Sequence, residues 1–354
     1  MSRYFSQKYA ALTPYTPGEQ PTDMKYVKLN TNESPFPPSE KAIAAADAEA
    51  RRLQLYSDPT SGALHKKLAE TLGLEPDEVL VTNGSDEILN FAFMAFCDEK
   101  SPAAFADITY GFYPVFAALN NIPYTEIPLR EDFTLAPEDY FGLGKTIFIA
   151  NPNAPTGLAL SRADVERILR ANPDHVVVID EAYVDFGGES CIPLIRQYDN
   201  LLVTQTFSKS RSMAGARVGF GAGCRELIRD LNTIKYSTNP YNVNRMSQAA
   251  AIGVLSDEDY TRANCQTVIE NRAYTTAELE KRGFSVLDSR ANFIFATHPA
   301  IAGKKLYEDL KARGVLIRHF EKPRLSPYNR ITIGSKEQMD IMLQKIDEIM
   351  EENV

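Results

Sequence analysis

The chain has 354 residues, of which 44% are hydrophobic and 24% are charged, and its formal net charge at pH 7 is −9. This length suffices for two domains with a sizeable core, and the composition is that of an ordinary soluble globular protein. The acidic balance argues against a nucleic-acid or anionic-membrane partner, and no apolar run approaches the length of a membrane span.

Residues 1–38 are rich in proline and tyrosine and show little periodicity. Such a segment could bury little apolar surface alone, so we expect an arm that lies over another part of the protein. Its first residues contain no apolar run long enough for a secretory signal, and we therefore expect a cytoplasmic protein. The cysteines agree with a reducing compartment because they are scattered without paired spacing: Cys97, Cys191, Cys224 and Cys265.

From residue 39 onwards, helical patterns alternate with short apolar runs of strand length. We predict two helices, one from Ser39 to about Leu55 and one from Ser61 to Leu72. A third helix is predicted over NGSDEILNFAFMAF, directly after a strand. The predicted strands are Glu78–Thr82, Ala103–Ala106, Tyr124–Ile127, Thr146–Ala150, Val176–Ile179 and Leu201–Val203. This alternation is typical of an α/β fold with a mostly parallel central sheet and helices on both faces.

After Lys235 the pattern changes. Residues 244–281 are mostly helical, and short strands then alternate with two helices, the last from Lys336 to about Glu351. The predicted strands here are Phe284–Leu287, Phe293–Ala296, Val315–Arg318 and Arg330–Ile333. We therefore predict an N-terminal arm over residues 1–38, a large domain over 39–240 and a smaller α+β domain over 241–354.

Polar side chains follow two neighbouring apolar runs of the predicted sheet. The first run ends in Asp180 and Tyr183, and the second ends in Ser208 and Lys209, with Arg217 eight residues further on. Ligands of open α/β sheets bind beyond the carboxyl ends of the strands, so we expect these side chains to converge. An ammonium is costly beside apolar strands, whereas a neutral amine there is a nucleophile that can form a Schiff base.

The segment Thr82–Asp86 lies between a predicted strand and a predicted helix, so its backbone N–H groups and the helix dipole make an anion site. Ser85 could equally be only the helix N-cap. Ser208 and Arg217 favour phosphate, since hydroxyls and a guanidinium fork are typical phosphate ligands. Asp180 could be a structural ion-pair partner, or it could face a protonated heterocyclic nitrogen in a ring used as an electron sink.

Two stretches resemble nucleotide-binding loops, but each lacks a glycine that such a loop needs. GLGKT (Gly142–Thr146) has Asp139 where a P-loop needs its first glycine, and it leads into a strand instead of leaving one. GFGAG (Gly219–Gly223) has Cys224 in place of the third glycine of a dinucleotide fingerprint. The histidines stand in no nucleophile or metal pattern, so we expect no metal site: His65, His175, His298 and His319.

Taken together, these stretches resemble the fold-type I, pyridoxal-phosphate-dependent aminotransferases, and among them the histidinol-phosphate aminotransferases. The resemblance covers nearly the whole chain and rests on LNTNESP, TNGSDE, ITYGFY, NPNAPTG, DEAYVDF and TFSKSRSMAGARVGF. LTPY near the start and NPYNVN point to the histidinol-phosphate branch. The resemblance implies the fold-type I architecture, with a large cofactor-binding domain and a smaller α+β domain.

It also implies pyridoxal 5'-phosphate as the cofactor, with Lys209 as the catalytic amine, Asp180 at the pyridine nitrogen, Tyr183 at the ring oxygen and Tyr110 over the ring. The implied phosphate ligands are Gly84, Ser85, Asp86, Thr206, Ser208 and Arg217, together with Tyr56 from the neighbouring subunit of a homodimer. The implied substrate contacts are Tyr15, Asn32, Arg318 and Arg330.

Two positions depart from the family pattern. Ala154 stands where relatives usually have an asparagine that binds the ring oxygen, and Asn153 is the candidate replacement. Ile341 lies near the position of a second arginine found in some relatives. The implied reaction is transamination of L-histidinol phosphate with 2-oxoglutarate, giving imidazole-acetol phosphate and L-glutamate in histidine biosynthesis. An aromatic or broad-range amino-acid aminotransferase and a pyridoxal-phosphate-dependent decarboxylase of phosphorylated amino acids remain alternatives.

Overall fold

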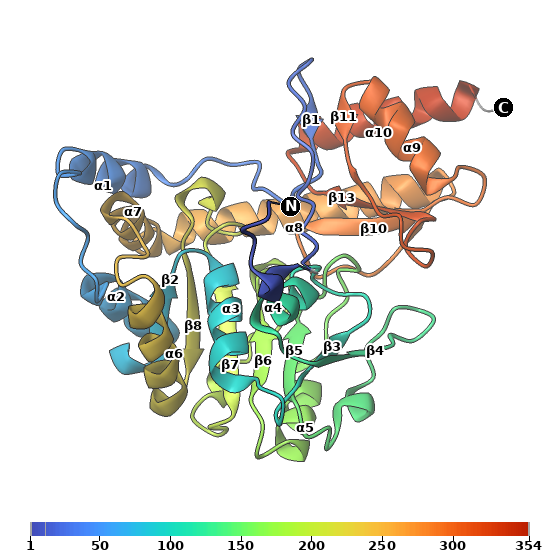
Figure 1. The fold of residues 1–354 in the computed structure, drawn as a ribbon. Coiled ribbons are helices and arrows are strands. Elements are labelled where there is room, and N and C mark those ends of the chain that lie inside the picture. Colours follow the sequence, from blue (N-terminus) through green and yellow to red (C-terminus); the bar gives the residue numbers. More distant parts are fainter. Residues whose placement is uncertain (1, 11, 353–354) are drawn as a thin grey trace.

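The computed structural model describes residues 2–10 and 12–352, and its main sheet has the strand order β2-β8-β7-β6-β5-β3-β4 (Figure 1). Neighbouring strands are parallel except that β8 runs antiparallel to both β2 and β7. The predicted mostly parallel central sheet is therefore confirmed. The strands are β2 Val79–Thr82, β3 Ala103–Ala106, β4 Tyr124–Ile127, β5 Thr146–Ala150, β6 Val177–Asp180, β7 Leu201–Thr206 and β8 Gly219–Gly223.

Helices cover both faces of this sheet because successive strand residues point to opposite sides. In β6, Val177 and Ile179 join the core beneath α2, α5 and α7, whereas Val178 joins the core beneath α3, α4 and α6. The helices of this part are α1 Glu40–Ala50, α2 Gly62–Leu72, α3 Ser85–Phe96, α4 Tyr113–Asn120, α5 Arg162–Ala171, α6 Arg225–Thr238 and α7 Arg245–Leu255. The first predicted helix therefore ends earlier than expected, at Ala50.

The long helix α8 (Glu258–Lys281) leads from the main sheet to a second, smaller unit (Figure 1). That unit has an antiparallel sheet in the order β12-β13-β10-β9, with a separate apolar core. Its elements are β9 Ser285–Val286, β10 Phe293–Thr297, β12 Arg318–His319, β13 Tyr328–Thr332, α9 Gly303–Ala312 and α10 Lys336–Glu352.

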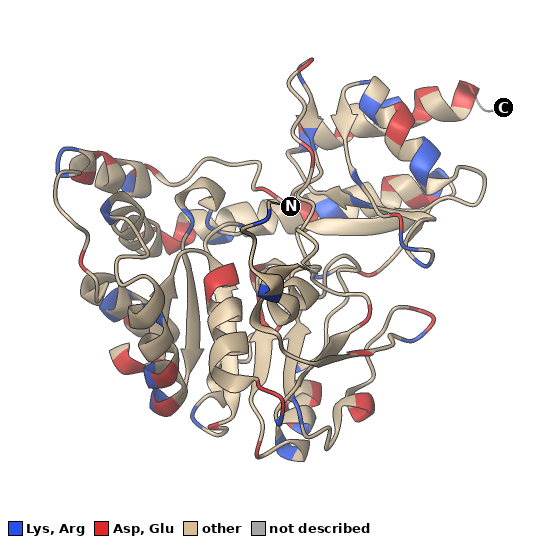
Figure 2. Ribbon diagram, viewed as in Figure 1, with Lys and Arg blue, Asp and Glu red and all other residues tan. Residues whose placement is uncertain are grey.

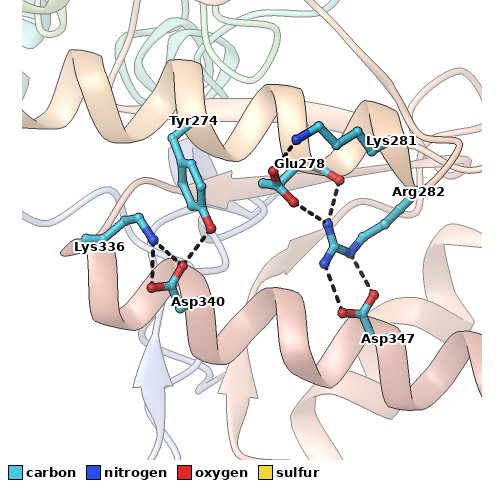
Figure 3. Close-up of polar contacts among 7 residues, drawn as sticks. All are labelled: Tyr274, Glu278, Lys281, Arg282, Lys336, Asp340 and Asp347. Carbon is cyan, nitrogen blue, oxygen red and sulfur yellow. Dashed lines mark hydrogen bonds and ion pairs between the residues drawn. The ribbon is translucent and has the colours of Figure 1, made fainter.

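Polar and charged contacts join α8 and its C-cap residue Arg282 to α10 (Figure 3). The Arg282 guanidinium donates to both carboxylate oxygens of Asp347, at 2.6 and 2.9 Å. Asp340 accepts from Lys336 at 2.6 Å and from the Tyr274 hydroxyl at 2.8 Å. The bidentate Arg282 pair has the geometry in which a surface ion pair is most stabilising.

The N-terminal segment contacts the C-terminal part of the chain through one short strand. Its short strand β1 (Val27–Lys28) pairs in parallel with β11 (Val315–Leu316). The prediction of a single strand over Val315–Arg318 was wrong. Two short strands lie there: β11 pairs with β1, whereas β12 (Arg318–His319) pairs with β13. α7, which follows residue 240, packs on the core of the large sheet, so the proposed domain limits stay a prediction.

Charged residues lie mostly on the helices and loops (Figure 2). Glu126 and Asp180 are the only charged residues in the seven strands of the main sheet, all of which lie in the described part of the chain. Glu126 is exposed at an edge strand, whereas Asp180 is buried at the carboxyl end of the central strand β6. Within residues 2–10 and 12–352, the structure contains no helix with the length and apolarity of a membrane span.

A substitution at Gly253 in α7 tests how closely α7 packs against α1. A Cβ atom there would lie 2.6 Å from the carbonyl oxygen of Lys41 and 2.7 Å from the Cα atom of Ala42. We expect Gly253→Ala to lower the free energy of unfolding by about 2 kcal/mol, because backbone atoms must move. Chemical denaturation should show no comparable loss in Gly215→Ala, where a Cβ meets nothing within 4 Å. Equal stability of the two variants would refute this packing.

Candidate active site

The polar residues predicted to converge line one cavity of about 190 Å³ beyond the carboxyl ends of β5, β6 and β7. Its lining includes Ser85, Asp86, Tyr110, Asp180, Tyr183, Thr206, Ser208, Lys209 and Arg217. A second cavity of about 580 Å³ shares Tyr110, Tyr183 and Lys209 with the first and extends to the arm and the smaller unit. The strand ends, the arm and the smaller unit therefore all contribute to this region.

One end of the first cavity has the features of an anion cradle. Helix α3 begins at Ser85 directly after Gly84, and its N-terminus has no side-chain cap among the described residues. The Arg217 guanidinium lies against Gly84, where an added Cβ would come within 2.6 Å of Nη2. At Gly219 an added Cβ would overlap the backbone nitrogen of Ser85. Glycine at both positions lets Arg217 and the start of β8 pack closely against the N-terminus of α3, where free N–H groups and the helix dipole favour an anion.

The two acids in the first turn of α3 have different surroundings. Glu87 accepts from the backbone N–H of Asn83 at 2.7 Å and from the side chain of Asn242. Asp86 lines the cavity, accepts from the Tyr110 hydroxyl at 2.8 Å and lies 3.6 Å from Arg217 Nη2. Asp86 thus holds the Tyr110 ring at the cavity wall and partly balances the charge of the guanidinium.

The partly buried amine of Lys209 donates to the carbonyl oxygen of Thr31 at 3.2 Å. It forms no ion pair with a carboxylate in the described part of the chain. Burial, followed by the Arg330 guanidinium, lowers the pKa of Lys209 to about 8, and Arg217 acts in the same direction. Glu33 and Asp86 oppose this shift. A lysine in such surroundings can serve as a nucleophile and a base near neutral pH.

Asp180 is a buried carboxylate with two hydrogen bonds. Its Oδ2 accepts from the Tyr113 hydroxyl and its Oδ1 from the Ala182 N–H, both at 3.2 Å. Burial, followed by the charge of Asp86, raises the pKa of Asp180 to about 7, and the two hydrogen bonds oppose that shift. A cation facing this carboxylate would favour its ionised form. Tyr113 was not among the residues predicted from sequence.

The Tyr183 hydroxyl accepts a hydrogen bond from Asn32 Nδ2 at 3.0 Å. Asn32 adopts a positive φ of 57°, and its Oδ1 accepts from the Thr332 hydroxyl at 3.0 Å. Burial raises the pKa of Tyr183, so this phenol stays protonated at neutral pH. Asn32, predicted as a substrate contact, lines the second cavity but also connects Tyr183 to β13.

The other predicted substrate contacts, Tyr15, Arg318 and Arg330, line the second cavity as well. Arg330 donates from Nη2 to the carbonyl oxygen of Asn30 at 3.0 Å, while its Nε has no partner among the described residues. Its guanidinium carbon lies 5.3 Å from the ring centre of Phe293. A guanidinium in the lining of a cavity is suited to binding a carboxylate or a phosphate.

Three predicted cofactor ligands do not line the first cavity: Gly84, which lies against Arg217 beside it, Asn153 and Tyr56. Asn153 lines a different pocket. Its side-chain Nδ2 donates to Ile108 O at 3.0 Å and to Thr156 Oγ1 at 3.1 Å, and its Oδ1 accepts from the Thr109 hydroxyl at 2.8 Å. Ala154 lines the cavity in its place, so the structure gives the Asn153 assignment no support. Tyr56 is 80% exposed and stacks on Tyr241, and its contribution to a neighbouring subunit stays a prediction.

Residues 24–346 match the family model described as aminotransferase class I and II. A histidinol-phosphate aminotransferase from Marinomonas sp. (strain MWYL1) is 50% identical over 343 residues, which cover 96% of this chain and 97% of the relative. One from Clostridium botulinum (strain 657 / Type Ba4) is 48% identical over 351 residues and 99% of each chain.

The fold is similar to that of solved structures. The crystal structure of histidinol-phosphate aminotransferase from Sinorhizobium meliloti in complex with pyridoxal-5'-phosphate aligns with a TM-score of 0.86. The alignment covers 93% of this chain and 92% of that one at 23% identity, so it supports the fold alone. A putative histidinol-phosphate aminotransferase from Erwinia carotovora atroseptica has the same TM-score at 25% identity, covering 92% and 96% of the two chains.

The lowered pKa of Lys209 predicts how its reactivity depends on pH. Reductive methylation, followed by mass spectrometry of the Lys209 peptide, should accelerate about tenfold per pH unit below 8 and level off above it. In Arg330→Met the plateau should begin at a higher pH, because a neighbouring cation has been removed. A rate that keeps rising towards pH 10, as for an amine with the reference pKa of about 10.4, would contradict this assignment.

Proposed function

This chain belongs to the class I and II aminotransferase family and, within it, to the histidinol-phosphate aminotransferases, and we propose that it transaminates L-histidinol phosphate with 2-oxoglutarate, using pyridoxal 5'-phosphate. The products would be imidazole-acetol phosphate and L-glutamate, as a step of histidine biosynthesis. The observation that carries the proposal is the amine of Lys209, which has no carboxylate partner among the described residues and shares one cavity with Asp180 and the anion cradle.

The residues of the first cavity fit each part of this cofactor. The N–H groups at the start of α3, with Thr206, Ser208 and Arg217, would hold the phosphate. Asp180 would bind the ring nitrogen and Tyr183 the ring oxygen, and the Tyr110 ring would lie against the face of the cofactor. When bound, the cofactor supplies a protonated pyridine ring that makes the substrate Cα–H bond acidic by delocalising the resulting charge.

The chain itself supplies the proton transfers. Lys209 would take the proton from the substrate Cα at Nζ and return it to the reacting system, which requires an amine that is neutral for part of the time. Its lowered pKa, caused by burial and Arg330, supports that role. Asp180 would keep the proton on the ring nitrogen, and the carbonyl oxygen of Thr31 holds the amine beside the cavity.

Arg330 would bind the anionic end of both substrates. It must accept a phosphate monoester in one half-reaction and a carboxylate in the other, and a guanidinium fork can bind either group. The position of Arg330 in the lining of the second cavity supports this assignment. Arg318 lines the same cavity and donates to the carbonyl oxygens of Thr16 and Pro17 at 3.4 Å, so it would contribute a second cation.

We propose a homodimer in which Tyr56 reaches the phosphate site of the neighbouring subunit. Leu53, Leu55 and Tyr56 are 59%, 52% and 80% exposed, and such an apolar patch is typical of an interaction surface. Two side chains of α7 hold the loop that contains Tyr56. Arg245 donates to the carbonyl oxygen of Tyr56 at 2.8 Å, and Gln248 donates to the carbonyl oxygen of Asp58 at 3.1 Å.

We also propose a cytoplasmic location, which the four free cysteine thiols support because structural disulfides are rare in that compartment.

The activity is tested by coupling amino-group transfer to 2-oxoglutarate with histidinol phosphate or phenylalanine as donor. The wild type should use histidinol phosphate in preference to phenylalanine, and borohydride should fix the cofactor to the Lys209 peptide. Lys209→Ala should bind the cofactor without a covalent bond and lose activity by at least about a thousandfold, since nucleophile and base are the same residue. The exposed-lysine variant Lys66→Ala should be unaffected. Full activity in Lys209→Ala would refute the assignment.

The shared site is tested by mixing Tyr56→Ala and Lys209→Ala, both of which we expect to have little activity alone, and allowing subunits to exchange. Each mixed dimer has one site with both native residues, so a statistical mixture should recover about a quarter of the wild-type activity. Either variant mixed with itself should recover none. Absence of recovery in mixtures whose mixed dimers are verified by mass spectrometry would show that Tyr56 does not serve the neighbouring site.

A further inference from the structure

Tyr113 is a completely buried tyrosine that touches two of the residues assigned to the cofactor ring. It is the first residue of α4, and its hydroxyl donates to Asp180 Oδ2 at 3.2 Å. Its ring meets that of Tyr110 edge-on, with centroids 5.7 Å apart and planes at 86°. Phe105 and Phe148, at 5.7 and 5.9 Å, enclose the same ring, so its position is fixed by packing.

The hydroxyl of Tyr113 is the only side-chain donor to Asp180 among the described residues, and the Ala182 N–H supplies the other hydrogen bond. Each carboxylate oxygen therefore has one directional contact, and together they fix the carboxylate plane. The negative groups around Asp180, namely Asp86 on α3 and the adjacent Glu181, disfavour its ionised form. The donated hydrogen bond from Tyr113 favours that form.

We propose that Tyr113 is a positioning residue for the transamination, acting on the ring nitrogen through the hydrogen bond from its hydroxyl to the buried carboxylate of Asp180. The proposal rests on the function proposed above. A proton shared between a carboxylate and a pyridine nitrogen can reside on either atom. A donor to the carboxylate stabilises the anion and so keeps the proton on the nitrogen, where it is needed to make Cα–H acidic.

A purely structural role for Tyr113 can be distinguished because the chain provides a matched control. Tyr140 is equally enclosed, with 1% of its surface exposed, but its hydroxyl has no hydrogen-bond partner among the described residues. It lies in the core beneath the other face of the sheet. Tyr113→Phe and Tyr140→Phe thus remove the same atom from two buried rings, and only the first removes a contact to Asp180.

The experiment compares wild type, Tyr113→Phe and Tyr140→Phe, each loaded with pyridoxal phosphate labelled with ¹⁵N in the ring. In Tyr113→Phe the ¹⁵N chemical shift should move towards that of unprotonated pyridine, and kcat should fall about tenfold, the effect of one hydrogen bond to a charged group. KM for histidinol phosphate should stay within about twofold, because no substrate contact is lost. Tyr140→Phe should match the wild type in all three measurements.

A wild-type shift and kcat in Tyr113→Phe would overturn the inference, as would an equal change in Tyr140→Phe. Should Tyr113→Phe fail to fold, a variant with 4-aminophenylalanine at position 113 keeps a weaker donor at the same place. A ¹⁵N shift between the wild-type value and that of unprotonated pyridine, with a kcat below that of the wild type, would then support the inference. Wild-type values of both would overturn it. Failure of the proposed function would instead appear in the wild type, as a protein that neither binds the labelled cofactor nor transfers an amino group.

Discussion

The parallel pairing of β6 with β7 determines where the chemistry of this protein can take place. Asp180 ends β6 opposite Thr204 of β7, and both strands run in the same direction. The chain beyond them therefore delivers the Asp180 carboxylate and the Lys209 amine to the same edge of the sheet. Arg217 lies just before antiparallel β8, whose first residue Gly219 pairs with Thr82 at the end of β2, so Arg217 lies at the start of α3. An acid, an amine and an anion cradle thus lie together because of strand order and direction.

The balance of charge within the cavity explains how an amine can remain reactive there. Arg330 and Arg217 disfavour the ammonium of Lys209, while Glu33 and Asp86 favour it, and burial decides the direction. The same Arg330 guanidinium is placed to bind the anionic end of a substrate. One residue would therefore serve both the reactivity of the amine and the orientation of the substrate. The arm takes part as well, since Thr31 holds Lys209 and Asn32 holds Tyr183.

Much of this arrangement could be predicted from sequence, because it depends on local patterns. The runs Ala103–Ala106 and Thr146–Ala150 coincide with β3 and β5, since short apolar runs suit strands buried in a parallel sheet. Tyr124–Ile127 coincides with β4, which is a mostly exposed edge strand. β8 was missed because its sequence, GFGAG, has little β propensity. Its glycines are explained only by tertiary packing, such as the contact that Gly219 makes with Ser85. β1 and β11 have two residues each, too few for any pattern.

Side-chain partners were less predictable than strand ends. Asn153 follows a strand end and resembles the missing asparagine, yet its amide is used by Thr109, Thr156 and Ile108. Tyr113 lies in an aromatic stretch with no polar pattern, so its contact with Asp180 depends on how α4 packs against β6. The most direct test of the central claim is a crystal structure of the protein grown with pyridoxal phosphate. We expect continuous electron density between the Lys209 side chain and a ring whose nitrogen lies within hydrogen-bonding distance of Asp180. A ring bound elsewhere, with Lys209 and Asp180 directed into separate regions, would contradict the account.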